Sequence, residues 1–125
     1  DPVVVLDRFR KYLKKGGKLF VAVPNGESLN RRLGYEMGLI DSLTDLNKND
    51  LSLGHKRNYS LKGLVDDIES AGYKVVTKEG IYLKPLPLPI LQSLENADAN
   101  FDAMLKVGID FPELSVGMLV EAVIA

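Results

Sequence analysis

The sequence predicts an α/β fold, in which helices flank a β-sheet. Three observations predict this class. A helical apolar pattern over residues 2–13 leads through a Gly-Gly pair into an apolar run at residues 18–23. A second helical pattern over residues 60–72 leads into a strand-like segment at residues 73–82, and another apolar run closes the chain at residues 118–124. Helical segments that alternate with apolar strands are typical of α/β proteins.

The first helix has clear start and stop signals. Asp1 precedes Pro2, which suits an N-cap acceptor followed by proline in the first helical position. Gly16 and Gly17 end the helical pattern, as glycine often does. The apolar residues of the expected buried stripe recur at helical spacing: Val5, Leu6, Phe9 and Leu13.

Residues 18–23 read KLFVAV, which is apolar without alternation. This pattern is typical of a strand covered on both faces, so we expect a strand of a parallel sheet. The other predicted strands supply too few neighbours for both of its edges, and an unpaired edge invites pairing with another chain. We therefore interpret residues 1–125 as a single partial domain that belongs to a larger sheet. Self-association or a partner subunit is the alternative.

The remaining elements follow in order. We expect a helix over residues 27–38, a polar irregular segment over 41–59, and a helix that Ser60 caps and Gly72 ends. The strand at 73–82 contains Gly80, which we interpret as a possible bulge. Residues 84–89 (KPLPLP) are expected to be extended, because each residue before a proline avoids the helical region. One further helix over residues 90–105 precedes the last strand.

Composition excludes several classes of function. The net charge is −1, with 16 basic and 17 acidic residues and no polybasic stripe, so we expect neither nucleic acid nor a membrane as a partner. The chain has no cysteine and one histidine, which argues against a disulfide, a thiol nucleophile and a transition-metal site. No apolar run approaches the roughly 20 residues of a membrane span. We expect a cytoplasmic protein.

Several segments together resemble class I S-adenosylmethionine-dependent methyltransferases, of the small bacterial type that acts on small molecules or glycan precursors. They are the helix before residues 14–33 (KKGGKLFVAVPNGESLNRRL), residues 54–60 (GHKRNYS), 71–75 (AGYKV) and 80–86 (GIYLKPL). The family usually has Lys-Pro-Gly-Gly before its fifth strand, and Lys15 replaces the proline here. The resemblance implies the C-terminal half of a Rossmann-like sheet. Its fifth, sixth and seventh strands would be present, with the last antiparallel between the other two.

The family binds its cofactor mainly through segments that cannot be mapped onto this chain, above all the glycine loop after the first strand. The resemblance therefore implies a parent methyltransferase that uses S-adenosylmethionine, with O-methylation of a small molecule or sugar as the expected reaction. Weak or no cofactor binding is expected from these 125 residues alone. A non-catalytic, methyltransferase-like interaction module is the alternative.

The candidate site residues lie in the segments that carry the resemblance. Histidine ordinarily titrates near neutral pH, so His55 is the candidate base, and Arg57 is a candidate substrate-binding residue, although both would also suit a purely structural loop. Tyr59 is a candidate for the acceptor pocket or a hydrophobic staple before the Ser60 cap. Asn25 follows a strand, where open α/β sheets bind ligands, but Pro-Asn is also a common turn. Tyr82 is expected to border the pocket.

Overall fold

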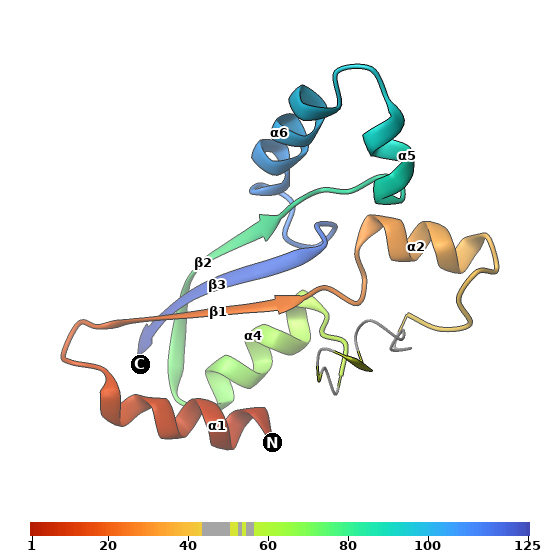
Figure 1. Cartoon of the computed structure of the whole chain (residues 1–125). Coiled ribbons are helices and arrows are strands. Elements are labelled where there is room, and N and C mark those ends of the chain that lie inside the picture. Colours follow the sequence, from red (N-terminus) through yellow and green to blue (C-terminus); the bar gives the residue numbers. More distant parts are fainter. Residues whose placement is uncertain (44–50, 53, 55–56) are drawn as a thin grey trace.

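The structure is a computed structural model that describes residues 1–43, 51–52, 54 and 57–125. It is a mixed α/β arrangement with a three-stranded antiparallel sheet and flanking helices (Figure 1). In chain order, the elements are α1 (Pro2–Phe9), the 3₁₀ helix η1 (Arg10–Tyr12), β1 (Lys18–Pro24), α2 (Leu29–Glu36), α4 (Leu61–Ser70), β2 (Tyr73–Ile81), α5 (Leu88–Ser93), α6 (Ala97–Gly108) and β3 (Gly117–Ile124).

Both predicted helix caps are confirmed. The Asp1 carboxylate accepts a hydrogen bond from the backbone N–H of Val3 at 2.9 Å, and the Ser60 hydroxyl accepts one from the N–H of Gly63 at 3.0 Å. Each side chain thereby satisfies a donor that has no partner within its own helix. The predicted apolar stripe of the first helix is only partly correct: Leu6 is buried, whereas Val5 and Phe9 are about half exposed.

The strand order is β1-β3-β2, and β3 is antiparallel to both neighbours. The last strand thus lies between the other two, the order that the resemblance implies. β1 and β2 consequently run in the same direction without touching. The prediction of parallel pairing for residues 18–23 is wrong for the part of the chain that is described, since β1 pairs there with β3 alone and in antiparallel register.

The core lies on one face of the sheet, against α1 and α4. Alternate residues of β1 point toward it, and side chains of both helices fill it. Its fully or nearly fully buried members are Leu6, Leu64, Ile68, Ala71, Tyr73, Met118, Val120 and Ala122. Figure 1 shows α1 and α4 together at one side of the sheet, with α5 and α6 together at the opposite end.

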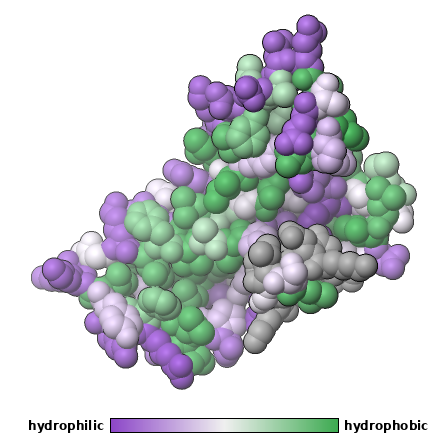
Figure 2. Space-filling view, in the orientation of Figure 1, coloured by the Kyte–Doolittle hydropathy of each residue, from purple (hydrophilic) through white to green (hydrophobic). Residues whose placement is uncertain are grey.

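The prediction that residues 18–23 are covered on both faces is wrong. Leu19, Val21 and Val23 are half-buried against the core, but the intervening side chains are exposed, and Phe20 keeps 58% of its surface accessible. The opposite face of the sheet also carries the ion pair of Lys18 with Glu121, at 2.7 Å. Figure 2 shows hydrophobic residues gathered over the sheet and α1 in this view.

The backbone of β1 shows which groups face its open edge. The N–H of Asn25 donates to the carbonyl of Val116 at 2.8 Å, in register with the pairs of the β1–β3 ladder. Hydrogen-bonded pairs alternate in an antiparallel ladder, so odd-numbered residues of β1 face β3. The N–H groups of Lys18, Phe20 and Ala22 therefore point outward. The N–H of Gly26 points to the same side, and it donates to the carbonyl of Tyr59 at 2.8 Å.

The second half of the chain differs from the prediction in three places. The irregularity in β2 lies between Val75 and Thr77 and not at Gly80. The predicted helix over residues 90–105 is divided into α5 and α6, because Leu94 after α5 is extended with ψ 149° and Asn96 before α6 is left-handed with φ 59°. The predicted extended segment ends early, since α5 begins at Leu88 with a proline in its first turn.

Among the described residues, no helix is both long enough and apolar enough to span a lipid bilayer.

Candidate functional site

The segments that follow β1 and β2 meet at the end of the sheet where β3 begins. Asn25 follows β1 and Tyr82 follows β2, and Val116 joins them. Its carbonyl accepts from the N–H of Asn25 and its N–H donates to the carbonyl of Tyr82, each at 2.8 Å. The isolated bridge of Asn25 with Tyr59 lies beside them. The structure thus brings three predicted site residues to the end of the sheet where α/β proteins bind ligands.

The side chain of Asn25 is buried, and all its polar groups are engaged. Its amide nitrogen donates to the carbonyl oxygens of Glu113 at 2.9 Å, Ser115 at 3.0 Å and Pro112 at 3.3 Å. Its amide oxygen accepts from the backbone N–H of Glu27 at 2.9 Å. These bonds fix the loop before β3 against the end of β1, so the geometry favours a positioning role. Binding of substrate by Asn25 stays a prediction.

Tyr59 packs against the core, and its hydroxyl donates to the Asp67 carboxylate on α4 at 2.9 Å. Burial, followed by the bond to Asp67, raises the pKa of the Tyr59 phenol to about 12. The phenol therefore stays protonated near neutral pH and acts as a donor. The Arg57 guanidinium lies 5.9 Å from the centre of the Tyr59 ring. This contact and the packing of Tyr59 suit the staple interpretation, and a substrate role for either residue stays a prediction.

Tyr82 differs from the other two, because its hydroxyl is buried and has no hydrogen-bond partner among the described residues. Its backbone adopts φ 64°, a left-handed conformation that is rare for a bulky side chain. Two hydrogen bonds hold it there: its carbonyl accepts from Val116, and the N–H of the next residue, Leu83, donates to the carbonyl of Met104 at 3.1 Å. The surrounding structure thus imposes a conformation that Tyr82 would otherwise avoid.

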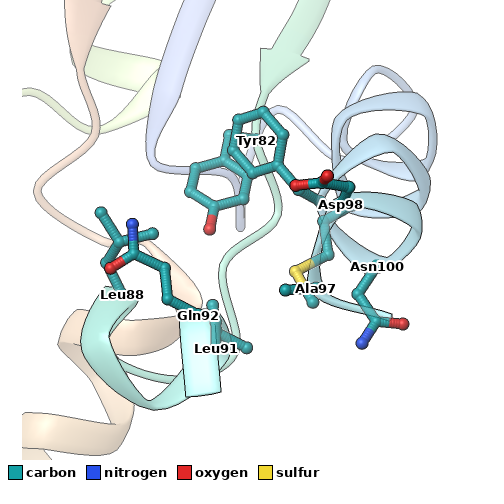
Figure 3. Close-up of a pocket in the computed structure, with 9 residues that line it drawn as sticks. Tyr82, Leu88, Leu91, Gln92, Ala97, Asp98 and Asn100 are labelled. Carbon is teal, nitrogen blue, oxygen red and sulfur yellow. The ribbon is translucent and has the colours of Figure 1, made fainter. Parts of the chain in front are cut away.

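The Tyr82 hydroxyl lies in a cavity of about 330 Å³ between α5 and α6. In Figure 3 the hydroxyl oxygen points toward the space between these helices, with Leu88 and Leu91 on one side and Ala97 and Asp98 on the other. The lining is mainly apolar and comes from the end of β2, α5 and α6: Tyr82, Leu88, Leu91, Gln92, Ala97, Asp98, Asn100, Phe101 and Met104.

His55 lies outside the described residues, so its role as a base stays a prediction. Within the part of the chain that the structure describes, no group of three acidic, histidine or cysteine side chains is placed to hold a metal ion.

No family model matches this chain, and no curated protein matches it. The methyltransferase resemblance therefore rests on the sequence segments quoted above.

Sequence reasoning missed the cavity, because Leu94, Phe101, Met104 and their neighbours follow one continuous helical period. That period predicts a single helix facing the core. One signal was available: Asn96 is a residue that tolerates the left-handed conformation, so it could end one helix and start another.

Proposed function

We propose that this chain is the C-terminal part of an S-adenosylmethionine-dependent methyltransferase that acts on a small molecule or a sugar, with oxygen as the methyl acceptor. The strand order supports the proposal: the final strand is inserted antiparallel between two strands that run in the same direction. The resemblance implies this arrangement for the last three strands of the family's sheet. A small sheet built from sequential hairpins would have the order β1-β2-β3 instead, because strands that follow each other in the chain usually pair with each other.

The chain's own residues would form the acceptor side of the site. S-adenosylmethionine supplies the methyl group when it is bound. The residues at the end of the sheet would position the acceptor, and alignment of reacting groups is a large part of catalysis in a bimolecular transfer. Tyr82 suits this role best, because its buried hydroxyl is free to donate a hydrogen bond to an acceptor molecule. His55 would accept or orient the acceptor's proton.

The described residues do not by themselves fit S-adenosylmethionine. The amide of Asn25 is fully used by the loop before β3, and the hydroxyl of Tyr59 is used by Asp67. The donors of these two side chains are therefore engaged within the chain and not directed at the cofactor's amino acid or ribose. We expect residues 1–125 to bind S-adenosylmethionine weakly or not at all.

The test combines the coding sequence before Asp1 with a calorimetric titration. The proposal expects an upstream Glu/Asp-x-Gly-x-Gly segment, and micromolar binding of S-adenosylmethionine only when that segment is part of the protein. The control is residues 1–125 alone, titrated under the same conditions. A coding sequence without such a segment would overturn the methyltransferase proposal. Micromolar binding to residues 1–125 alone would show that the site is complete within this chain.

The second candidate is a non-catalytic module that completes its sheet with a partner chain. The outward N–H groups of Lys18, Phe20 and Ala22 favour it, as does the exposed Phe20 ring beside them. An edge strand with an apolar exposed side chain is a template for pairing with another strand.

Sedimentation at increasing protein concentration tests this second candidate. Ala22→Pro removes an outward N–H without removing a bond to β3, so it should block edge pairing and leave the fold intact. Phe20→Lys places a charge on the same strand and should act in the same direction. A wild-type protein that stays monomeric at high concentration contradicts self-association. If it associates, equal association of both variants shows that another surface is responsible.

A further inference from the structure

We propose that the cavity between β2, α5 and α6 binds a small, neutral aromatic molecule that accepts a hydrogen bond from the Tyr82 hydroxyl. The inference uses only the geometry of this cavity and does not depend on the methyltransferase proposal. Its ligand is defined by size, by the aromatic wall, by one polar contact and by the absence of a buried charge.

The size of the cavity limits the ligand to a small molecule. About 330 Å³ is at the lower end of the range for small-molecule sites, and it is roughly twice the volume of an engineered protein cavity that binds benzene. One substituted ring or a fused pair of rings therefore fits. A nucleotide or a peptide segment does not.

The wall favours an aromatic ligand. The rings of Tyr82 and Phe101 are 5.0 Å apart at their centres and inclined by 59° to each other. Aromatic rings prefer tilted or offset partners at such distances, so the pair offers a surface against which a third ring can pack. The thioether of Met104 lies in the same lining and adds a polarizable contact of the kind that sulfur makes with rings.

The buried polar contact comes from Tyr82. The described residues provide no partner for this hydroxyl, so only water or a ligand in the cavity can remove the cost of an unmade hydrogen bond. A ligand carbonyl, ether or ring nitrogen would accept its proton and remove this cost. The hydroxyl thereby selects for molecules that have an acceptor at one edge of the ring.

Close packing holds Tyr82 in a backbone conformation that tyrosine disfavours. Gly108 at the end of α6 lies so close that a Cβ atom on it would be 2.8 Å from the nitrogen of Leu83 and 3.0 Å from that of Tyr82. Glycine therefore lets α6 pack directly on the backbone of this segment. Two residues with a left-handed backbone flank α5 in the chain: Tyr82 before it and Asn96 after it. Asparagine tolerates this conformation, but a tyrosine in it is strained, and strained residues concentrate at ligand sites.

The charge of the lining favours a neutral ligand. Asp98 is the one lining residue that carries a charge at neutral pH, and it is exposed to solvent. A negatively charged ligand would be repelled by this carboxylate. A positive charge would lose its hydration against an apolar wall without a buried partner, which is costly.

The three methionines of the chain provide a direct measurement. With ¹³C-labelled methionine methyl groups, Met104 reports on the cavity, whereas Met37 is 70% exposed and Met118 is fully buried in the sheet. The probes are acetophenone, which has a carbonyl acceptor, and ethylbenzene, which has nearly the same shape without it. We expect a saturable shift of Met104 alone, with acetophenone binding at about 1 mM or tighter.

Tyr82→Phe separates the hydroxyl from the ring. We expect it to weaken acetophenone binding about threefold to tenfold, the effect of one hydrogen bond, and to leave ethylbenzene binding unchanged. Tyr12→Phe is the matched control, since Tyr12 is 72% exposed and lies outside the cavity. Ala97→Leu adds a side chain to the lining and should abolish the Met104 shift with both probes while the protein stays folded.

Three results would overturn the inference. The first is the absence of a saturable Met104 shift with acetophenone. The second is an equal shift of Met37, which would indicate non-specific contact. The third is a Tyr82→Phe protein that binds acetophenone as well as the wild type does.

Discussion

Replacement of Asn25 by alanine should strongly destabilise the fold. The amide nitrogen makes two short bonds, to Glu113 and Ser115, and a longer one to Pro112, and the amide oxygen accepts from Glu27. Each lost hydrogen bond costs about 0.5–1.5 kcal/mol, and a buried carbonyl left without a donor costs about 1–3 kcal/mol. Because the losses share one side chain and partly overlap, we expect about 2–4 kcal/mol in total.

Asn25→Asp tests the direction of these bonds. The carboxylate keeps the shape of the side chain and can still accept from Glu27, but it cannot donate to three carbonyl oxygens. It should therefore destabilise the protein at least as much as alanine does. Asn100→Ala is the control, since the amide of Asn100 makes one exposed bond of 3.3 Å to Glu95. Its effect should stay within about 0.5 kcal/mol.

Urea unfolding followed by circular dichroism measures all three variants. With a slope of about 1–2 kcal/mol per molar urea, a loss of about 3 kcal/mol lowers the midpoint by roughly 1.5–3 M. A loss below about 1 kcal/mol in both Asn25 variants would refute the positioning role. It would then favour the interpretation of Asn25 as a residue kept for substrate.

Two further predictions follow from single positions. Gly80→Ala should cost more than about 3 kcal/mol of stability or prevent folding, because its Cβ would meet the carbonyl oxygen of Gly108. Gly34→Ala, which has open space around its Cβ position, should add up to about 1 kcal/mol of stability. Urea unfolding compares the two variants, and equal effects would contradict the close approach at Gly80. The pKa of Tyr59 at about 12 lies above the ordinary 10, so the stability that this phenol contributes is complete below pH 10 and is lost as the pH rises toward 12. In absorbance titration, Asp67→Asn should move the Tyr59 transition to lower pH, and an unmoved transition would show that the carboxylate has no part in the shift.

Local signals in the sequence predicted the elements, because their causes are local. Asp1 and Ser60 cap their helices through side chains that reach only two or three residues ahead. The strand at residues 118–124 is apolar enough to be recognised from its own residues. Its position between β1 and β2 came from the family resemblance, since pairing partners far apart in the chain leave no trace in a local pattern.

The errors arose where one pattern has two physical causes. An apolar run such as KLFVAV predicts burial, but it does not say whether helices exist to cover both faces, and here only one face is covered. A glycine within a strand marks either a bulge or a close approach of backbone. Gly80 is the second kind: a Cβ there would lie 2.1 Å from the carbonyl oxygen of Gly108, while the irregularity falls beside Val76.

The cavity between β2, α5 and α6 could not be predicted from the sequence, because contacts between distant residues form it. Leu94, Phe101 and Met104 share a helical period, and a single straight helix would have turned all three to the same side. Leu94 is extended after α5 and Asn96 is left-handed before α6, so the helix is broken between them, and Leu91 on α5 lines the same open space as residues of α6. Tyr82 then occupies that space only because Val116 and Met104 hold its backbone in a conformation that its own side chain disfavours. The backbone preference of tyrosine disfavours this left-handed conformation. The contacts that impose it come from residues far away in the sequence, and they are the observation that favours a ligand-binding role for the hydroxyl.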